Sequence, residues 1–186
     1  TSNVKNFTGL FMSATSFNQS LNEWDTSNVT EMIATFVGAT SFNQPLNNWD
    51  TSKVENMRSL FDCSMNFNQD ISNWDVSNVT DMNRMFGCYG SDNKTKFNHD
   101  ISTWDVSKVF NMEYMFASSE FNQDISSWDV SNVGNMNYMF FASLFNQDLS
   151  NWDVSNVYFC EFFWNNNSSW TEPKPNFTNC DPDEFY

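Results

Sequence analysis

The sequence predicts an α/β repeat solenoid, in which coils of about 25 residues each contribute one short parallel strand and one short helix. A string of the form Phe-Asn-Gln-Asp-Ile-Ser-x-Trp-Asp-Val-Ser-x-Val recurs, with variations, six times along residues 1–153. Apolar and aromatic residues recur at fixed places in each copy, so stacked copies would form continuous columns. A residue that every copy repeats usually serves stacking, which argues against most catalytic roles.

The repeat divides the chain into a six-coil segment and a C-terminal segment. The coils span residues 1–25, 26–50, 51–75, 76–105, 106–129 and 130–153. The fourth coil is longer because residues 87–96 contain an insertion. Residues 154–186 begin a seventh, partial coil and then leave the repeat, with clustered aromatics and several prolines that predict a C-terminal cap.

The helix of each coil is predicted from an apolar face. Val79, Met82 and Phe86 are spaced at i, i+3 and i+7, which places their side chains on one side of a short helix. Ser77 or Asn78 would cap its first turn, because their side-chain oxygens can accept from unpaired helix amides.

The strand is predicted just before this helix. Trp74 and Val76 are two residues apart, so both side chains point to one face of an extended segment. Strands of neighbouring coils would pair in parallel, about 4.8 Å apart. The Phe-Asn-Gln loop would return the chain to the next strand, with its asparagines forming an internal hydrogen-bond ladder to loop backbone. This asparagine column is Asn18, Asn43, Asn68, Asn98, Asn122 and Asn146.

The repeat resembles a known family of surface proteins. Residues 121–133 read Phe-Asn-Gln-Asp-Ile-Ser-Ser-Trp-Asp-Val-Ser-Asn-Val and are similar to the BspA-type surface-protein repeat, also called the mycoplasma lipoprotein-associated bacterial surface repeat. That family is grouped with leucine-rich repeats, and Ile125, Trp128 and Val130 look like their strand signature. The resemblance covers residues 1–157. It implies exposure at the cell surface and an adhesive or structural role, and it carries no catalytic residues.

Composition and charge narrow the range of partners. The chain has 8 basic and 23 acidic residues, a formal net charge of −15, which is unsuited to nucleic acid or an anionic membrane. No apolar run reaches transmembrane length, so direct membrane insertion is not expected. The chain begins in mid-pattern at Thr1 without an initiator methionine, and we expect a processed chain or a fragment.

Four cysteines fall into two pairs. Cys63 and Cys88 occupy equivalent positions in adjacent coils, where their backbones would lie about 5 Å apart, close enough for a disulfide. Cys160 and Cys180 bracket the C-terminal segment and would hold the cap. Buried free thiols are the alternative for both pairs. Disulfides favour an extracellular or cell-surface location.

Asparagine glycosylation is also expected. The sequon Asn-x-Ser/Thr is frequent, although an asparagine-rich repeat produces it by chance as well. The candidate sites are Asn28, Asn78, Asn93, Asn176, Asn6 and Asn167. Occupied sites would make the protein an extracellular glycoprotein.

Two columns of aspartates raise the question of calcium. One column is Asp25, Asp50, Asp75, Asp105, Asp129 and Asp153, and the other is Asp70, Asp100, Asp124 and Asp148. Carboxylates stacked about 5 Å apart repel each other. Hydrogen bonds from nearby serine hydroxyls and backbone amides would compensate. The alternative is bridging by Ca²⁺, with Asp75, Asp105 and Asp129 as ligands. No other cofactor is expected.

An enzyme is not expected. His99 is the sole histidine and stands where other coils have glutamine. Nucleophilic catalysis therefore lacks a His–Ser–Asp or Cys–His combination. Glycoside hydrolysis needs two carboxylates in unlike environments, whereas a repeated column supplies like ones.

The sequence therefore predicts a non-catalytic extracellular structural protein, a subunit of a glycosylated surface fibre assembled head to tail. The first coil would lack a cap while the far end is aromatic, and a head-to-tail contact that does not close forms a filament. The residues expected at this contact are Val4, Phe7, Phe11, Phe163, Trp164 and Trp170.

The alternative is a monomeric adhesin repeat that binds a host protein or glycan through one face. Its best candidate patch is the insertion at residues 89–96, which no other coil repeats. The aromatic residues expected to be exposed are Tyr89, Tyr114, Tyr138, Tyr158 and Trp170.

Overall fold

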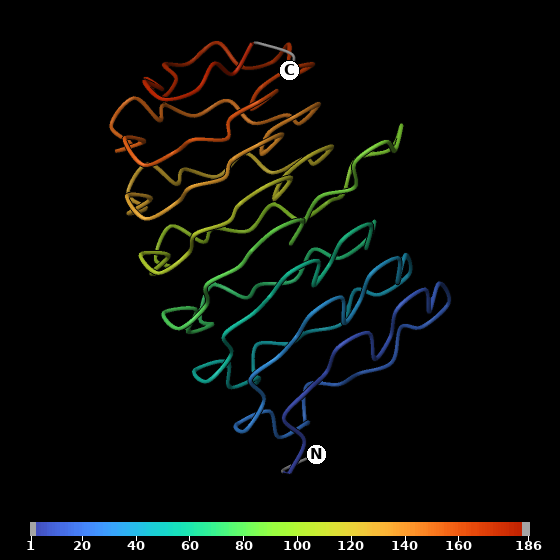
Figure 1. The fold of residues 1–186 in the computed structure, drawn as a ribbon. Coiled ribbons are helices and arrows are strands. Elements are labelled where there is room, and N and C mark those ends of the chain that lie inside the picture. Colours follow the sequence, from blue (N-terminus) through green and yellow to red (C-terminus); the bar gives the residue numbers. More distant parts are fainter. Residues whose placement is uncertain (1–2, 184–186) are drawn as a thin grey trace.

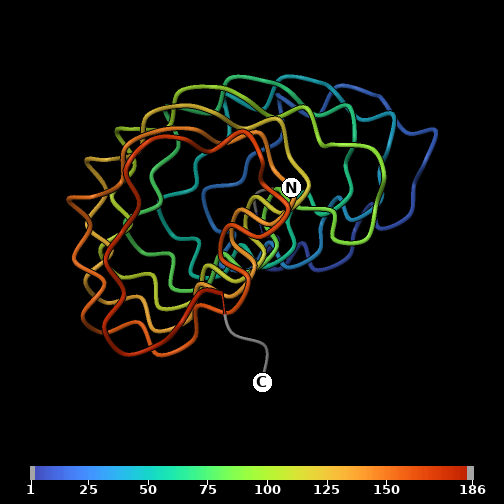
Figure 2. The same cartoon turned by 90° about the horizontal axis from the view of Figure 1, so that it is seen from above.

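The protein is a stack of coils that climbs from the N-terminus to the C-terminus (Figure 1). The computed structural model describes residues 3–183. Successive coils are turned about the stack axis, so that their loops fan out when seen from above (Figure 2). Parallel β-bridges link one residue of each coil to the next through Asn6, Glu31, Asn56, Asp81, Asn111, Asn135 and Phe159. The steps between these residues follow the repeat of the sequence, including the longer fourth coil.

The predicted fold class is wrong in its elements. Among residues 3–183 there is no helix, and strands are reduced to isolated bridges, of which Thr95–Ser119 is one outside the main column. The coils therefore do not follow the strand-and-helix pattern of leucine-rich repeats, and the α/β assignment is replaced by a stack of turns. Within the same residues, no helix is long and apolar enough to span a membrane.

Backbone conformation explains why the predicted helices do not form. Arg84 lies inside the predicted helix of the fourth coil, yet its φ of 57° is in the left-handed region that a right-handed helix excludes. A positive φ recurs at this position in the other coils, at Gly9, Ala34, Ser59, Tyr114, Tyr138 and Phe162. Four-residue turns, such as the one closed by the bond from Met85 N to Met82 O at 3.1 Å, keep the apolar side chains on the inner side. The spacing of these apolar residues in the sequence is close to the period of a helix, which explains the wrong prediction.

The amides of this segment bond to the neighbouring coil instead of to their own turn. Met82 N donates to Asn111 O at 3.0 Å. Arg84 N donates to Glu113 O at 2.8 Å, and Cys88 N donates to Ala117 O at 2.9 Å. The other coils repeat this pattern of alternate amides, so each coil is held by its neighbours and would not persist alone.

The predicted strand is also a turn. Trp74 N donates to Ile71 O at 3.1 Å, which closes the turn. The Trp74 indole Nε1 donates to Leu46 O of the preceding coil, also at 3.1 Å. Buried tryptophans of four other coils make the same bond. Tryptophan side chains thus provide the contact that backbone pairing was expected to provide.

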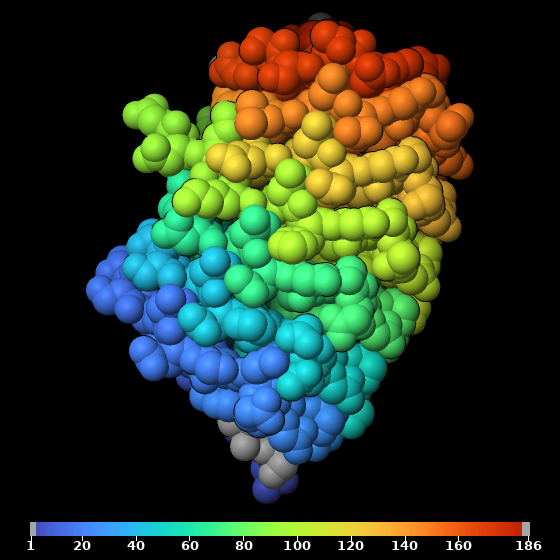
Figure 3. All heavy atoms as spheres, turned by 180° about the vertical axis from the view of Figure 1, so that it is seen from behind, coloured from blue at the N-terminus to red at the C-terminus, as the bar shows by residue number. Residues whose placement is uncertain are grey.

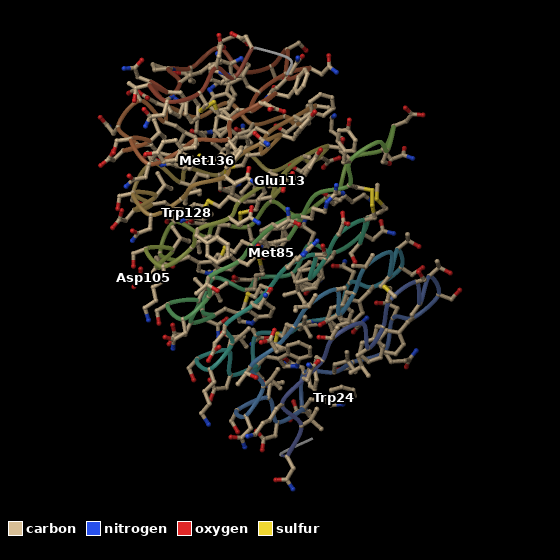
Figure 4. All side chains as sticks on the ribbon, in the orientation of Figure 1. Trp24, Met85, Asp105, Glu113, Trp128 and Met136 are labelled. Atoms are coloured by element: carbon tan, nitrogen blue, oxygen red, sulfur yellow. A yellow bond between two sulfur atoms is a disulfide. The ribbon has the colours of Figure 1, made fainter. Side chains whose placement is uncertain are left out.

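Two ladders of phenylalanine run through the core. In the first, from Phe11 to Phe140, ring centroids of neighbouring coils lie 5.3 to 5.8 Å apart. In the second, from Phe17 to Phe145, they lie 5.9 to 6.2 Å apart. Trp128 lies inside the stack, whereas Asp105 lies at its outer edge (Figure 4).

The predicted asparagine ladder is present, but its members are exposed or half-buried, so it is not internal as expected. Asn43 N donates to Asn18 Oδ1 at 2.9 Å, and the same bond recurs through the column. Thr171 N continues it by donating to Asn146 Oδ1 at 2.6 Å. His99 replaces the glutamine of other coils, with Nε2 3.1 Å from Asn68 O. This histidine is therefore part of the loop structure.

Two disulfides join the cysteines that the sequence paired. Cys63–Cys88 connects adjacent coils beside the insertion, which projects from the stack as a green segment (Figure 3). Cys160–Cys180 ties down the C-terminal segment. There Trp170 meets Phe140 edge-on, with an angle of 82° between the rings, so the parallel stacking of the ladder ends.

The tryptophan bond makes a testable contribution to stability. We expect Trp128→Phe to lower the free energy of unfolding by about 0.5–1.5 kcal/mol, because it removes the buried indole hydrogen bond to Ile101 O, which still accepts from the Trp104 amide. Urea unfolding measures the change. The control is Trp24→Phe, because Trp24 belongs to the first coil and is only partly buried. Equal losses for both variants would contradict this role of the indole.

Candidate binding surface

The aspartate columns are engaged by serines. In both columns Oδ1 of each aspartate accepts from the backbone N of the serine two residues on, at 2.9 to 3.1 Å. The Ser52 hydroxyl, followed by the Ser52 amide, lowers the pKa of Asp50 below its usual value. Asp105 is held in the same way by Ser107. These bonds provide the compensation that the sequence required for stacked carboxylates.

The calcium candidates Asp75, Asp105 and Asp129 lie on the exposed side of the stack and make these same serine bonds. Within residues 3–183, no group of three or more histidine, cysteine, aspartate or glutamate side chains is arranged to hold a metal ion.

The glycosylation candidates differ in burial. Asn167 is buried, and its Nδ2 donates to Phe145 O at 2.9 Å and Ser143 Oγ at 3.1 Å. The atom that would carry a glycan is therefore held inside the protein, which removes Asn167 from the candidates. Asn78 is exposed, but its Nδ2 donates to Ser52 O at 2.8 Å. The remaining candidates, all exposed, are Asn6, Asn28, Asn93 and Asn176.

Half of the residues expected at a head-to-tail contact lie in the core. Phe7, Phe163 and Trp170 are only 1, 0 and 5% exposed. Phe11 and Trp164 are partly buried against the same core, whereas Val4 is 40% exposed. The buried members fail as contact residues because the coils and the C-terminal segment already cover them.

Two apolar residues of the first coil are more exposed than the expected ones. Leu10 is 48% exposed and Met12 is 57% exposed.

The tyrosines beside the insertion form a self-packed cluster. Tyr114 stacks on Tyr138 with centroids 4.6 Å apart, and the guanidinium carbon of Arg84 lies 4.2 Å from the Tyr114 centroid. The half-exposed Tyr89 meets Tyr114 edge-on at 4.9 Å. Burial, more than the neighbouring Tyr138, raises the pKa of Tyr114 to about 12. The tyrosine rings pack against one another and against Arg84, so this cluster leaves little ring surface for a ligand.

A different group of aromatics borders a hollow on the C-terminal half of the stack. Phe110, Tyr158 and Phe159 are 54, 62 and 56% exposed. They line a hollow of about 330 Å³, which we call the aromatic hollow. Its other lining residues are Asn111, Asn132, Gly134 and Asn135.

The register of the coils brings these residues together. Gly134 N donates to Phe110 O at 3.0 Å, and Tyr158 N donates to Gly134 O at 3.1 Å. The three residues are thus consecutive members of one column. Its earlier members are Lys5, Thr30, Glu55 and Thr80. Phe159 ends the neighbouring column of bridge residues, whose earlier members are all polar.

Only part of this surface was predicted from the sequence. Tyr158 was expected to be exposed, whereas Phe110 and Phe159 were not among the expected residues. The available signal was positional, because the residue after each column valine is polar in the first four coils and aromatic at Phe110. Trp170, also expected to be exposed, is buried in the cap.

Two acidic groups lie apart from the aspartate columns. Glu113 accepts from Asn83 Nδ2 at 3.1 Å and from Asn135 Nδ2 at 3.3 Å, which links three coils (Figure 4). Burial raises the pKa of Asp62 to about 6, although the nearby Arg84 opposes this shift.

One comparison with known proteins gives a match. Residues 1–94 and 91–177 each match the family described as “Mycoplasma protein of unknown function, DUF285”. The match agrees with a mycoplasma-type surface repeat without identifying the BspA type or leucine-rich repeats. Searches of the curated proteins and of the solved structures found no match.

Asp62 predicts an effect of pH on stability. Its folded pKa of about 6 lies above the usual aspartate pKa of 3.8, so its ionisation destabilises the fold as pH rises through this interval. We expect Asp62→Asn to raise the free energy of unfolding at pH 7.5 by up to about 3 kcal/mol, and to change it little at pH 3.5.

Urea unfolding at the two pH values measures this effect. Asp92→Asn, at an exposed aspartate of the insertion, is the control. The same change at both pH values would show that the Asp62 charge is not the cause.

Proposed function

The chain belongs to the family described as “Mycoplasma protein of unknown function, DUF285”, and we propose that it is a non-catalytic adhesive protein of the cell surface or extracellular space. In this proposal it is a surface repeat of the BspA type, it needs no cofactor, and it binds its partner through the aromatic hollow. The partner is a host protein or glycan.

The location is supported by the two disulfides. Cys63–Cys88 and Cys160–Cys180 pair all four cysteines. Structural disulfides persist in oxidising compartments and are rare in the cytosol. They fit a secreted or surface protein, on which Asn93 and Asn176 are exposed candidates for glycosylation.

The aromatic hollow is the observation that carries the adhesive function. A repeat surface is otherwise polar at these positions, because each column repeats one kind of side chain. Phe110, Tyr158 and Phe159 break that rule together, on coils two steps apart with Gly134 between them, and all three are more than half exposed. A cluster of exposed aromatic side chains is costly to leave in water and is typical of interaction sites.

The environments of the candidate acid and base groups support a non-catalytic role. The column carboxylates share one kind of environment, each accepting from a serine. His99 is held near the Asn68 carbonyl, where it takes the place of a glutamine. Acid–base chemistry needs groups whose environments separate their pKa values.

Adhesion of coated beads tests the proposal. We expect beads that carry the native protein to adhere to immobilised mucin. The double variant Phe110→Ser, Tyr158→Ser should lose most of this adhesion, because it removes two walls of the hollow. Tyr89→Ser, at an exposed tyrosine outside the hollow, is the matched control and should keep it.

The same beads are tested on mucin after enzymatic removal of its glycans. Adhesion that persists there assigns the partner to protein, and adhesion that is lost assigns it to glycan. A native protein that does not adhere, or a double variant that adheres as well as the native protein, would overturn the adhesive function.

Head-to-tail assembly into a fibre is a second candidate, favoured by the first coil. Val4 and Leu10 are 40 and 48% exposed, whereas the residues at their column positions in the third coil, Val54 and Leu60, are fully buried. A coil of a second copy placed beneath them would bury these side chains. The C-terminal end would then contribute the outer surface of its cap.

Negative-stain electron microscopy tests the fibre. We expect rods longer than one stack for the native protein and only short rods for Leu10→Glu, because a charge on the first coil would be buried unpaired in the contact. Leu144→Glu, at an apolar residue that is also 41% exposed, is the control and should still assemble. Short rods alone from concentrated native protein would contradict the fibre.

A further inference from the structure

We propose that the aromatic hollow binds one neutral sugar ring, inserted between Phe110 and Tyr158 above Gly134. This rests on the proposed adhesive function, since it names the ligand class of the same site. Gly134, the spacing of the coils and the polarity of the rim support this ligand class.

Gly134 is not required by the fold. Its φ is not in the left-handed region, and a Cβ there would meet only the carbonyl oxygens of Asn156 and Phe110, each at 3.9 Å. These are ordinary van der Waals distances, so a larger residue would fit. Thr30 and Thr80 occupy this column position in other coils. The fold therefore does not require a glycine at this position. The missing side chain leaves the space of the hollow.

The width of the gap suits one ring. Backbones of adjacent parallel segments lie about 4.8 Å apart, so Phe110 and Tyr158, two steps apart in the column, are separated by about 10 Å. A ring stacked between two aromatic faces needs about 7 Å between those faces, so a separation of about 10 Å leaves room for one ring and not for two. A hollow of about 330 Å³ is at the small end of ligand sites, which again indicates a single ring.

The lining contains no charged side chain. By contrast, other hollows in the described part of the chain contain Lys53 and Glu55, Asp100 and Asp124, or Lys94 and Glu120. A net charge of −15 also repels anions, including nucleotides and acidic sugars. The ligand that suits this site is neutral.

The rim distinguishes a sugar from an apolar side chain. Three carboxamides, those of Asn111, Asn132 and Asn135, border the hollow. Asn132 Nδ2 donates to Ser107 O at 2.7 Å, and Asn111 Oδ1 accepts from Glu113 N at 3.1 Å. Asn135 Oδ1 accepts from Asn137 N at 3.0 Å, and its Nδ2 donates to Glu113 Oε2 at 3.3 Å. A carboxamide has four hydrogen-bonding positions, so each of the three groups keeps positions for a ligand. Sugar hydroxyls both donate and accept, while the C–H faces of the ring are apolar. A sugar thus matches the walls and the rim, whereas an aromatic or proline side chain matches only the walls.

Calorimetric titration tests the sugar site. The probes are glucose, galactose, mannose and N-acetylglucosamine, each as monomer and short oligomer, together with glucuronic acid and a peptide of alternating tyrosine and proline. We expect at least one neutral sugar to bind with a Kd of roughly a millimolar for a single ring. Glucuronic acid should bind more weakly than glucose.

Two variants locate the binding. Gly134→Thr should weaken sugar binding at least tenfold, since it fills the hollow with a side chain that this column already tolerates. Phe110→Ser should weaken it as well, by removing one wall. Thr30→Gly is the matched control, because it empties the same column where no aromatic residue flanks it, and binding should be unchanged.

Three results would overturn the sugar site. They are no binding by any neutral sugar, binding of the peptide alone, and a Gly134→Thr variant that binds sugar as well as the native protein does. If mucin adhesion through the hollow persists in these cases, the adhesive function stands and only the ligand class is wrong.

Discussion

Hydrogen bonds from alternate backbone amides to the carbonyls of the next coil are the constraint on which the rest of the structure depends. They run from Met82 to Asn111 and from Arg84 to Glu113, and they recur in the other coils. The chain combines these bonds with turns inside each coil, such as Met85 N to Met82 O, and takes a positive φ at positions such as Arg84, which excludes a helix. The same bonds set the register that stacks the phenylalanine rings at 5.3 to 5.8 Å. Stability therefore lies between coils rather than within them.

This register also determines what the surface can do. Each outward position becomes a column, and its chemistry is repeated from coil to coil. Repetition suits structural roles, as in the asparagine ladder from Asn18 to Asn146. A local binding site requires a break in repetition. The change from Thr80 to Phe110, Gly134 and Tyr158 is such a break, and it lies on a scaffold whose backbone is the same in neighbouring coils.

The features that were predictable from the sequence are those that depend on register alone. The repeat places Cys63 and Cys88 at equivalent positions, so their pairing needs only the fact of stacking. The asparagine ladder follows for the same reason. The helix and strand were not predictable in this way. The spacing of Val79, Met82 and Phe86 fits both a helix and a series of four-residue turns. The two differ in where the backbone amides donate, to the same segment in a helix or to the next coil here.

The sequence alone thus determined that the chain stacks, with which period, and which side chains meet those of the next coil, because periodicity translates directly into columns. The tertiary structure alone decided how each coil is built and which side chains remain in water. Phe163 and Trp170 are buried because the C-terminal segment folds over the last coil, whereas Phe110 and Tyr158 stay exposed. Exposure depends on what covers a residue, and in the C-terminal segment, which leaves the repeat, the linear pattern does not show this. Predicting the hollow above Gly134 takes two kinds of information. The sequence shows the column in which Phe110, Gly134 and Tyr158 follow one another, and the structure gives the coil spacing that sets the width of the hollow.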